Sequence, residues 1–458
     1  MHSFADSWIV KLNTSAVNSI MQQYGGYVQQ VVNSSGGIYR IWLPSGSLGT
    51  LLAKAIQTNP LVKSIEPDSV VTLPQTTASS SSTARYTAAP LNLVALPQTC
   101  TNFTIPGGSH GTPAAGSAYA LYLHQTSNCL IEINKGQSAY GVTGQGVTVA
   151  VIDTGVDFTN PYLDGKVVLP GPSAFAYGSQ DFTGNNDPGG TIAQETSPMV
   201  DQETSPMVDQ ETSPMVDSAG TFLLNQETSP MVDQETSPMV DSHGNKLPPA
   251  LGHGTMVAGI IHLVAPGSPI LSLKAFTNDG FAATSSLLAA IYYAANQPAV
   301  HVINASWSTT GSSNLLNDAV AYAISKGKIV VAAVANNGSL QPVYPAAYPN
   351  VIGVGCTDDT DARCTFSNFG SDVNLAAPGF GITSTFPMAY SKSGFATGSG
   401  TSFSTPYVAG TVALIQAKGN PNSAQTTNDL TKGGAKLPSS LNLGGARLDV
   451  YGALGQVK

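Results

Sequence analysis

Strand-length apolar runs alternate with helical patterns over most of the chain that follows Gln145. The apolar runs cover residues 147–152, 270–275, 300–305, 329–335 and 351–355, and the helical patterns cover residues 255–264, 284–295, 314–325 and 404–417. Continuous runs of Val, Ile and Ala between helices are typical of parallel strands that are buried on both faces. The pattern predicts a three-layer α/β domain over residues 141–458, which binds ligands at the carboxyl ends of its strands.

A second, smaller domain is predicted before this one. Within residues 7–73, strand patterns cover residues 8–12, 27–32, 38–43 and 62–71, and helical patterns cover residues 15–24 and 48–57. The order strand, helix, hairpin, helix, strand is that of a split β-α-β arrangement. We therefore expect a small α+β, ferredoxin-like domain over residues 1–74.

The stretch between the two domains has little periodicity. Residues 74–90 are of low complexity and rich in Ser and Thr, so that little of this segment can be buried and proteases can reach it. Residues 91–140 are rich in Gly, Ser and Thr. We expect residues 75–140 to form a linker and an irregular segment that is braced by Cys100 and Cys129.

The charge of the chain is low and unevenly distributed. Only 10% of the 458 residues are charged, against about 25% in average soluble domains, which argues against a disordered or nucleic-acid-binding chain. The formal net charge is -9, and an octapeptide, Gln-Glu-Thr-Ser-Pro-Met-Val-Asp, occurs five times, starting at Gln194, Gln202, Gln210, Gln226 and Gln234. Because each copy carries two carboxylates, the rest of the chain is close to neutral and its charge predicts no partner.

The octapeptide block, residues 191–245, is expected to be an acidic insert within the larger domain. A proline in every eight residues prevents a long helix, and the period matches no common solenoid. We therefore expect an exposed acidic loop. It is either a repeat expansion that the surface tolerates, or a carboxylate-lined element that binds calcium or modulates the substrate.

The chain has neither a membrane-spanning run nor a leader of the usual kind. No stretch of about 18 apolar residues occurs, and the first six residues lack the basic start and apolar core of a signal peptide. The four cysteines form two local pairs, Cys100 with Cys129 and Cys356 with Cys364, without the Cys-x-x-Cys spacing of zinc or redox sites. We expect two disulfides in an oxidising compartment, with four inert buried thiols as the alternative.

Three short phrases carry the residues of an acid, a base and a nucleophile. Asp153 ends the apolar run at residues 147–152, and His253 lies between Gly252 and Gly254 at a helix start. Ser402 lies in the phrase Gly-Thr-Ser-Phe-Ser-Thr-Pro at the head of the last long helix. In this order, and with these flanking residues, the chain resembles the subtilisin-like serine peptidases, a group that general accounts of the triad also use as an example.

The resemblance implies a role for each of these side chains. Ser402 is the nucleophile, His253 takes and returns its proton, and Asp153 orients the imidazole. The oxyanion donors are the Ser402 backbone N–H and the amide of Asn336, which follows a buried strand as the matching Asn does in the family. Ala335 replaces the usual Gly and Asn337 follows directly, so the register can slip by one residue. Asn304 is the rival amide, in a segment that resembles the one that pairs with the substrate backbone.

The resemblance also implies how a peptide substrate binds. An extended peptide lies between two edge segments, one with Gly280 and Phe281 and one with Ser306, Trp307 and Ser308. Trp307 has a plain core role as its alternative. The specificity pocket is walled near Ala335 and Val343, two positions that are often Gly in the family, so a preference for small or medium apolar residues is expected.

Further expectations concern the N-terminal domain and the partners. The domain resembles the inhibitory propeptide of these enzymes, with its tail, residues 70–74, in the cleft like a product; an unrelated accessory domain is the alternative. We expect a secreted monomer without a cofactor, from which the signal peptide is missing. Protein or peptide substrates and its own propeptide are the expected partners, without nucleic acid or membrane.

The sequence departs from the family at one expected metal site, and it leaves two alternative functions to consider. Tyr162 and the short connection at residues 262–266 occupy the positions of a calcium site in the family, and neither offers suitable oxygen ligands, so that site is expected to be absent. A serine-carboxyl peptidase would need a Glu in place of His253. The remaining alternative is a catalytically inactive binding protein on the same scaffold.

Overall fold

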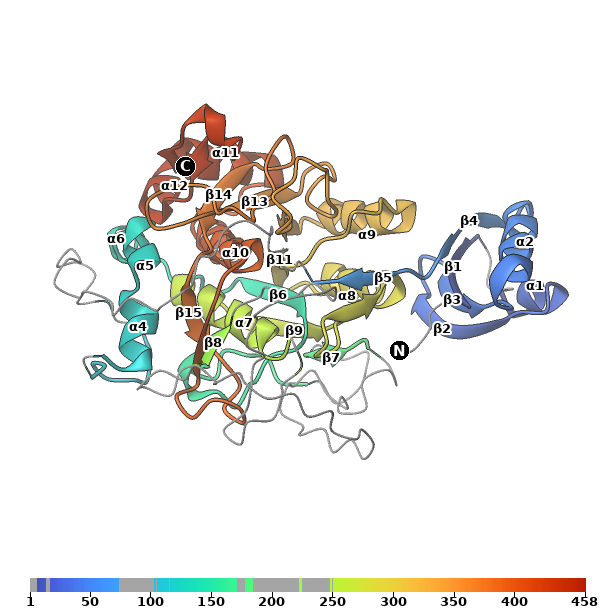
Figure 1. Cartoon of the computed structure of the whole chain (residues 1–458), viewed down its shortest axis with the longest axis horizontal. Coiled ribbons are helices and arrows are strands. Elements are labelled where there is room, and N and C mark those ends of the chain that lie inside the picture. The colour runs from blue at the N-terminus through green and yellow to red at the C-terminus, as the bar shows by residue number, and fades with distance from the viewer. Residues whose placement is uncertain are drawn as a thin grey trace, which may run out of the picture.

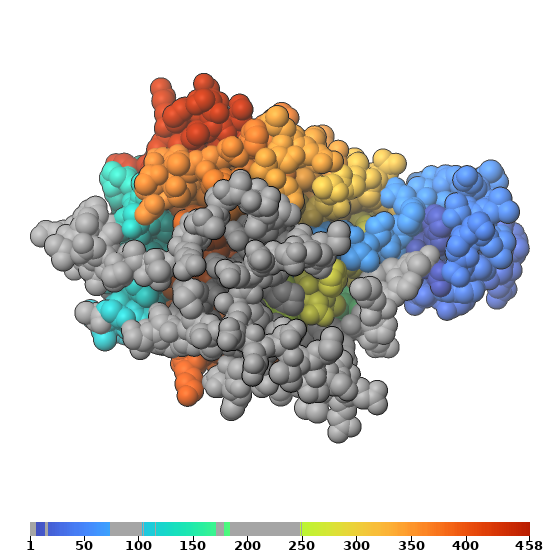
Figure 2. Space-filling view, viewed as in Figure 1, coloured from blue at the N-terminus to red at the C-terminus, as the bar shows by residue number. Residues whose placement is uncertain are grey.

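The protein is described by a computed structural model that covers residues 6–13, 17–73, 103, 105–114, 116–170, 178–183, 222–224, 248 and 250–458. Two parts are visible in Figure 1, a small N-terminal domain at one end and a large α/β domain. In the space-filling view of Figure 2 the N-terminal domain is a separate blue lobe. The linker at residues 74–90, Cys100 and the octapeptide copies lie outside the described residues.

A nine-stranded sheet is the centre of the large domain, in the order β17-β18-β14-β13-β12-β11-β6-β9-β7. All of its paired neighbours are parallel except β17 and β18. The strands are β6 (Thr148–Asp153), β7 (Gln180–Asp181), β9 (Ile270–Lys274), β11 (Val300–Ala305), β12 (Ile329–Ala333), β13 (Ile352–Thr357), β14 (Leu375–Pro378), β17 (Ala435–Lys436) and β18 (Ala446–Arg447). The prediction of a mostly parallel sheet is confirmed.

Helices cover both faces of this sheet, and the alternation of side chains along β6 shows how. Val149 and Val151 belong to one apolar core together with α7 (His253–Val264) and α10 (Thr401–Gly419). Ala150 and Ile152 belong to a second core with α8 (Thr284–Asn296) and α9 (Asn314–Ser325). Because successive side chains of a strand point to opposite faces, the result is the three-layer α/β arrangement.

The N-terminal domain has its own core and the predicted element order. Its antiparallel sheet has the order β2-β3-β1-β4, and the apolar faces of its two helices cover it. The elements are β1 (Ser7–Leu12), α1 (Val17–Gln23), β2 (Tyr27–Asn33), β3 (Ile38–Trp42), α2 (Gly46–Gln57) and β4 (Val62–Pro67).

The last strand of this domain is shorter than the sequence suggests. The pattern at residues 62–71 predicts one strand, but β4 ends at Pro67 and a separate strand, β5 (Val70–Thr72), pairs with β10 (Phe281–Ala283) of the large domain. Asp68 lies at the break, with its carboxylate buried against Ser285. A single apolar run therefore serves two sheets, because this carboxylate binds to the neighbouring domain.

The expectation of an irregular segment over residues 75–140 is wrong for its last part. Three short helices occur there, α4 (Ala118–His124), α5 (Thr126–Leu130) and α6 (Ile133–Tyr140). Helices this short are unstable alone and depend on tertiary packing. Here the packing comes from Tyr119, Tyr122, Leu123, Ile131 and Ile133, which are buried in the core that contains α7 and α10.

The remaining elements complete the large domain. A three-stranded sheet contains β15 (Ile382–Thr385), β16 (Phe395–Gly398) and β8 (Phe222–Leu224). The backbone of β8 lies in the spacer between the third and fourth octapeptide copies and pairs with β16, so part of the expected loop is a strand. The helices α11 (Ser423–Gly433) and α12 (Val450–Gln456) pack together near the C-terminus. Within the described ranges, none of the helices has the length and apolar character needed to cross a membrane.

Candidate active site

The carboxyl end of β6 and the first turn of α7 bring a carboxylate and an imidazole together. Nδ1 of His253 lies 2.7 Å from Oδ1 of Asp153, and both side chains are buried. Oδ1 of Asp153 also accepts a hydrogen bond of 2.7 Å from the backbone N–H of Thr154. Nε2 of His253 is buried and has no hydrogen-bond partner among the described residues. The imidazole is thus oriented at Nδ1 and has its second nitrogen available for proton transfer.

Glycines next to His253 are needed for this close approach. A Cβ atom on Gly254 would lie 2.0 Å from the carbonyl oxygen of Gly155 and 3.2 Å from Cβ of Asp153. Gly252 has a φ of +81°, and a Cβ there would lie 2.0 Å from the ring of Phe386. A larger residue at position 254 would push α7 away from β6, and one at position 252 would displace Phe386.

Ser402 lies in the first turn of α10, which packs against α7. Its Oγ is buried and has no hydrogen-bond partner among the described residues. The ring of the next residue, Phe403, lies with its centroid 5.5 Å from that of His253. A buried hydroxyl and a buried imidazole nitrogen without partners, on two helices in contact, are the groups that a nucleophile and its base provide.

The candidate oxyanion donors surround the backbone of Gly400. A Cβ atom on Gly400 would lie 3.0 Å from Oγ of Ser402, 3.1 Å from Nδ2 of Asn336 and 3.7 Å from the Ser402 backbone nitrogen. Oδ1 of Asn336 accepts hydrogen bonds from the backbone N–H and the hydroxyl of Thr401, at 2.8 and 2.9 Å. The carboxamide is therefore oriented with Nδ2 near the nucleophile.

The rival amide, Asn304, has a different function in this arrangement. Its Nδ2 donates a hydrogen bond of 2.9 Å to Oγ of Ser306, and that hydroxyl donates one of 2.8 Å to the carbonyl oxygen of Ser402. All three residues are buried. Asn304 thus supports the backbone of Ser402 through the hydroxyl of Ser306, and its amide donates to Ser306 instead of the oxyanion position.

The predicted substrate segment with Gly280 and Phe281 is paired with another strand. β5 lies antiparallel to β10, with Thr72 opposite Phe281 and Val71 opposite Ala282. The backbone N–H of Leu73 continues the ladder with a bond of 3.0 Å to the carbonyl oxygen of Gly280. Figure 1 shows β5 reaching from the N-terminal domain to the large domain beside α8.

The comparison with known families decides which kind of fold carries this site. The profile described as "Subtilase family" matches residues 144–441. The chain belongs to the subtilase family. The resemblance to subtilisin-like serine peptidases is thereby confirmed, and the match covers both core layers and every candidate catalytic residue.

Relatives of this subtilase cover part of its length. Thermophilic serine proteinase of Bacillus sp. (strain AK1) is 33% identical over 301 residues, which are 64% of this chain and 55% of that protein. Thermitase of Thermoactinomyces vulgaris is 42% identical over 178 residues, 37% of this chain and 62% of that protein. The chain therefore spans between half and two thirds of the length of these two relatives.

A solved structure extends the likeness to the whole fold. The crystal structure of fervidolysin from Fervidobacterium pennivorans, a keratinolytic enzyme related to subtilisin, matches with a TM-score of 0.67 and 20% identity. The match covers 98% of this subtilase and 61% of the fervidolysin chain. It includes the N-terminal domain, and it bears on the fold alone.

The second predicted substrate segment lies deeper in this subtilase than expected. Trp307 is fully buried in the core between the sheet and α8, with its ring centroid 6.0 Å from that of Phe276. Ser306 is buried as well and Ser308 is nearly so. Any contact of this segment with a peptide is therefore made by the backbone, because the indole of Trp307 has the core role that the sequence left as its alternative.

The two residues predicted to wall the specificity pocket are both buried. Ala335 is 4% and Val343 2% exposed, and both belong to the core on the side of α8 and α9. Ala335 has a φ of +73°, a region in which a non-glycine residue is strained. Glycine adopts this conformation without the strain that a Cβ atom brings.

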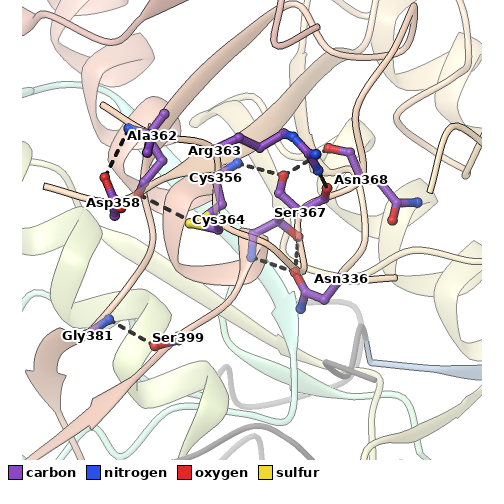
Figure 3. Close-up of a disulfide and its surroundings, with 12 residues drawn as sticks. Asn336, Cys356, Asp358, Ala362, Arg363, Cys364, Ser367, Asn368, Gly381 and Ser399 are labelled. Carbon is purple, nitrogen blue, oxygen red and sulfur yellow. Dashed lines mark hydrogen bonds between the residues drawn. A yellow bond between two sulfur atoms is a disulfide. The ribbon is translucent and has the colours of Figure 1, made fainter. Parts of the chain in front are cut away.

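The disulfides of this subtilase are described in part. Cys356 and Cys364 are bonded to each other across the turn that follows β13, and Figure 3 shows this disulfide beside the loop of Asn336. Cys129 is disulfide-bonded, and its predicted partner Cys100 lies outside the described residues. The first pair thus connects the sheet to a turn that adjoins the site.

Tyr162, the residue in the position of a calcium-binding carboxylate, is part of an aromatic cluster. Its ring centroid lies 4.5 Å from those of His110 and Phe395 and 4.9 Å from that of Tyr119. Among the described residues, no group of three or more His, Cys, Asp or Glu side chains is arranged to hold a metal ion.

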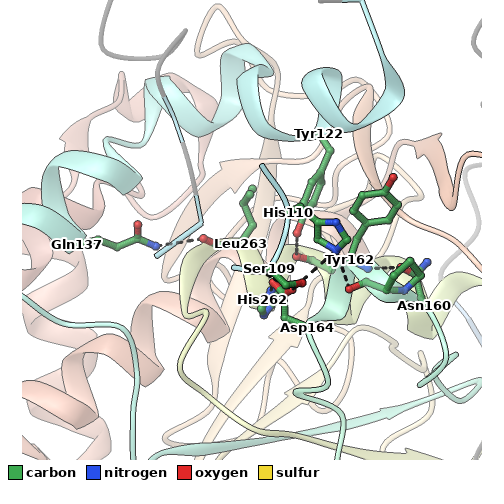
Figure 4. Close-up of polar contacts among 11 residues, drawn as sticks. Ser109, His110, Tyr122, Gln137, Asn160, Tyr162, Asp164, His262 and Leu263 are labelled. Carbon is green, nitrogen blue, oxygen red and sulfur yellow. Dashed lines mark hydrogen bonds and ion pairs between the residues drawn. The ribbon is translucent and has the colours of Figure 1, made fainter. Parts of the chain in front are cut away.

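Asp164 connects the segment at Ser109, next to His110 of this cluster, to helix α7. Its Oδ1 accepts hydrogen bonds from the backbone and hydroxyl of Ser109, at 3.0 and 2.5 Å, and its Oδ2 lies 3.2 Å from Nε2 of His262 on α7 (Figure 4). Burial alone would raise the pKa of the Asp164 carboxyl, but the hydrogen bonds from His262 and Ser109 outweigh it and hold the pKa well below its usual range. The C-terminal half of the helix that begins with His253 is thereby held in place.

Two supporting roles were missed in the sequence, that of Thr401 and that of Ser306, which was expected to contact the substrate. Thr401 orients Asn336, and Ser306 holds the carbonyl of Ser402. The Gly-Thr-Ser phrase contains the signal for Thr401, since a hydroxyl directly before the nucleophile is able to hydrogen-bond groups that surround the active site. No local signal identifies the partner of Ser306, which is 96 residues away.

Proposed function

We propose that this subtilase is a serine endopeptidase that hydrolyses peptide bonds through Asp153, His253 and Ser402. The observation that carries the proposal is the convergence of Oγ of Ser402, its backbone nitrogen and Nδ2 of Asn336 around Gly400, at the start of a helix that packs against α7. The first residue of α7 is His253, which is buried and paired with Asp153 of β6. Nucleophile, base and oxyanion donors are the minimum that acyl transfer needs.

The chemistry follows from these groups. Oγ of Ser402 bonds to the carbonyl carbon while its proton moves to Nε2 of His253, and the negative charge on the carbonyl oxygen is stabilised by Nδ2 of Asn336 and the Ser402 N–H. Asp153 holds the imidazole and stabilises its charged form. His253 then protonates the amine nitrogen as the C–N bond breaks, which leaves an acyl ester on Ser402. Water attacks this ester while its proton moves to Nε2 of His253, and the proton passes to Oγ of Ser402 as the ester bond breaks.

The activity is tested by labelling with a fluorophosphonate and by cleavage of casein. We expect Ser402→Ala to abolish both labelling and cleavage. Ser404→Ala is a matched control, because its hydroxyl lies in the same helical turn, is buried and has no hydrogen-bond partner among the described residues. This variant should be labelled and cleave casein as the wild type does. Normal labelling of Ser402→Ala would place the nucleophile at another residue. A wild type that stays unlabelled after processing of its N-terminal domain would support an inactive binding protein.

We further propose that the N-terminal domain is an inhibitory propeptide and that the chain is a secreted, monomeric zymogen. The support is that β5 occupies the segment with Gly280 and Phe281, where a substrate strand would pair. Val71 and Leu73 are 3% and 2% exposed, in the core of the large domain, whereas Val70 is 48% exposed. The alternating burial is that of a strand seated on a surface with apolar sites.

Two acidic side chains strengthen the docking of this domain. Oε2 of Glu66 accepts a hydrogen bond of 2.7 Å from Ser313, the N-cap of α9. Asp68 accepts bonds of 2.9 and 2.8 Å from the backbone and hydroxyl of Ser285, in the first turn of α8. Burial raises the pKa of the Asp68 carboxyl, and Arg40, 2.8 Å away, offsets part of the rise. Carboxylates at helix N-termini are favourable partners of the helix dipole.

The docking is tested in the Ser402→Ala background, in which the chain cannot process itself. We expect Val71→Asp to detach β5, because a buried carboxylate without a partner is costly, while Val70→Asp leaves it attached. Hydrogen exchange of the amides at residues 280–284 should accelerate in the first variant only. Because Val71 lies outside the apolar cluster formed by the N-terminal domain alone, that domain should stay folded. Equal exchange in both variants would contradict the proposal.

A further inference from the structure

A second chain segment holds the loop that carries Asn336. The backbone N–H groups of Asn368 and Phe369 donate to the carbonyl oxygens of Ala335 and Ser339, both at 3.1 Å. In the other direction, the N–H of Gly338 donates to the carbonyl oxygen of Phe366 at 2.6 Å. Residues 335–339 are therefore fastened to residues 366–369 at both of their ends.

The side chain of Asn368 completes this attachment. Its Oδ1 accepts hydrogen bonds from the backbone N–H groups of Asn337 at 2.9 Å and Ser339 at 3.2 Å. Asn368 is 3% exposed, so these bonds are shielded from solvent in the folded protein. Together with its own N–H on Ala335, Asn368 contacts the backbone directly before and directly after Asn336. Ala335 has a φ of +73°, and such a conformation persists only where the surroundings enforce it.

The disulfide holds Asn368 in turn. The hydroxyl of Ser367 accepts from the N–H of Cys356 at 3.0 Å and donates to the carbonyl oxygen of Asn368 at 2.9 Å. The N–H of Ser367 donates to the carbonyl oxygen of Cys364 at 2.9 Å. Figure 3 shows Cys356 hydrogen-bonded to Ser367 and Ser367 to Asn368, with Asn336 in the same view.

We propose that Asn368 is a positioning residue for the oxyanion site, and that the Cys356–Cys364 disulfide keeps it in register with β13. This inference rests on the proposed peptidase function. The carboxamide oxygen of Asn336 is held by hydrogen bonds from Thr401. Its backbone is held by the hydrogen bonds of Asn368 to Ala335 and Asn337. A donor must be placed in advance to stabilise the transition state, and displacements of about 1 Å can reduce a rate about 100-fold.

The test compares kcat, KM and the affinity for a peptide boronate, which mimics the tetrahedral state, per active site counted by fluorophosphonate. We expect Asn368→Ala to lower kcat and boronate affinity roughly 10- to 100-fold with little change in KM. Asn368→Asp keeps the acceptor oxygen and should recover most of the loss. A general loosening of the fold would not be recovered in this way.

A double-mutant cycle with Asn336→Ala separates positioning from a merely structural role. If Asn368 acts through Asn336, its substitution should have less than a twofold effect on kcat once the Asn336 amide is gone. The disulfide is tested by Cys356→Ala with Cys364→Ala, and by reduction of the folded wild type, with an expected loss of roughly threefold to tenfold in kcat.

The outcomes distinguish this inference from the function on which it rests. A wild type that stays unlabelled and inactive after processing of its N-terminal domain would overturn the peptidase function. An active wild type with an unchanged kcat in Asn368→Ala, or equal losses with and without Asn336, would overturn the positioning role alone. Should Asn368→Ala not fold, an unchanged kcat of the reduced wild type would overturn the proposal as well.

Discussion

Thr401 donates two hydrogen bonds to the carboxamide oxygen of Asn336, from its backbone N–H at 2.8 Å and from its hydroxyl at 2.9 Å. Thr401 directly precedes Ser402. The residue before the candidate nucleophile therefore sets the orientation of the candidate oxyanion donor. The first turn of α10 thus positions both the hydroxyl of Ser402 and the amide of Asn336.

This relationship predicts the effect of removing the amide. Asn336→Ala should lower kcat about 10²- to 10³-fold with a small change in KM, because one oxyanion donor is lost. The measurement is steady-state kinetics on a peptide p-nitroanilide, with active sites counted by fluorophosphonate.

The rival amide provides the comparison for that experiment. Asn304→Ala removes a bond to Ser306 and should cost less boronate affinity than Asn336→Ala. A larger loss in Asn304→Ala would reverse the assignment of the oxyanion donor.

The strained conformation of Ala335 predicts an unusual response to glycine. Ala335→Gly should destabilise the protein less than Ala333→Gly does, and the two free energies of unfolding should differ by about 1–2 kcal/mol. This difference is the cost of a left-handed conformation for a residue with a Cβ. Ala333 lies in β12 and is also buried, so both variants share the loss of a methyl contact and the entropy of glycine. Urea unfolding of both in the Ser402→Ala background measures the difference; equal losses would show that Ala335 is unstrained.

The specificity pocket gives a prediction about substrates. We expect small or medium apolar residues on the acyl side of the cleaved bond, since Ala335 and Val343 occupy volume that glycines would leave open. Forcing a large group into such a space costs about 1–3 kcal/mol, or about 10- to 200-fold in kcat/KM. Val343→Gly should raise kcat/KM for Phe and Tyr relative to Ala, with Val343→Ala in between. A peptide-library profile of the wild type that favours Phe or Tyr would contradict this.

The low pKa of Asp164 predicts a contribution to stability that depends on pH. A carboxyl whose pKa falls on folding stabilises the native state above its ordinary pKa, 3.8, and loses that contribution as the pH drops below this value. Asp164→Asn should therefore lower the free energy of unfolding at neutral pH by about 1–3 kcal/mol, and the difference from the parent should shrink below a pH of about 4.

The control for this prediction is Asp359→Asn, because Asp359 is exposed on the turn between the cysteines. Urea unfolding from pH 3 to pH 7 in the Ser402→Ala background gives both curves. A constant difference between Asp164→Asn and its parent over this range would show that the carboxylate is not the source of the effect.

The sequence by itself determined the fold class and the residues that come together at its centre. Asp153 and His253 are 100 residues apart, yet each follows or begins an element whose apolar pattern is unambiguous. Strand ends and helix starts of a parallel sheet meet at one edge, so their juxtaposition follows from the pattern alone. The family resemblance rests on the short motifs around Asp153, His253 and Ser402. The residue types at these positions are limited by the chemistry that each side chain performs.

Only the tertiary structure decided between groups with the same local signal. Asn304 and Asn336 both end or follow buried strands, and the choice depends on distant contacts: Asn304 reaches the carbonyl of Ser402 through Ser306, and Asn336 binds Thr401. The run at residues 62–71 reads as one strand, but its second half pairs with β10 because Asp68 binds the start of α8. The three helices at residues 118–140 likewise depend on the core that receives them. Periodicity records which face is apolar, whereas the partner of a polar group is set by the packing of segments far apart in the chain.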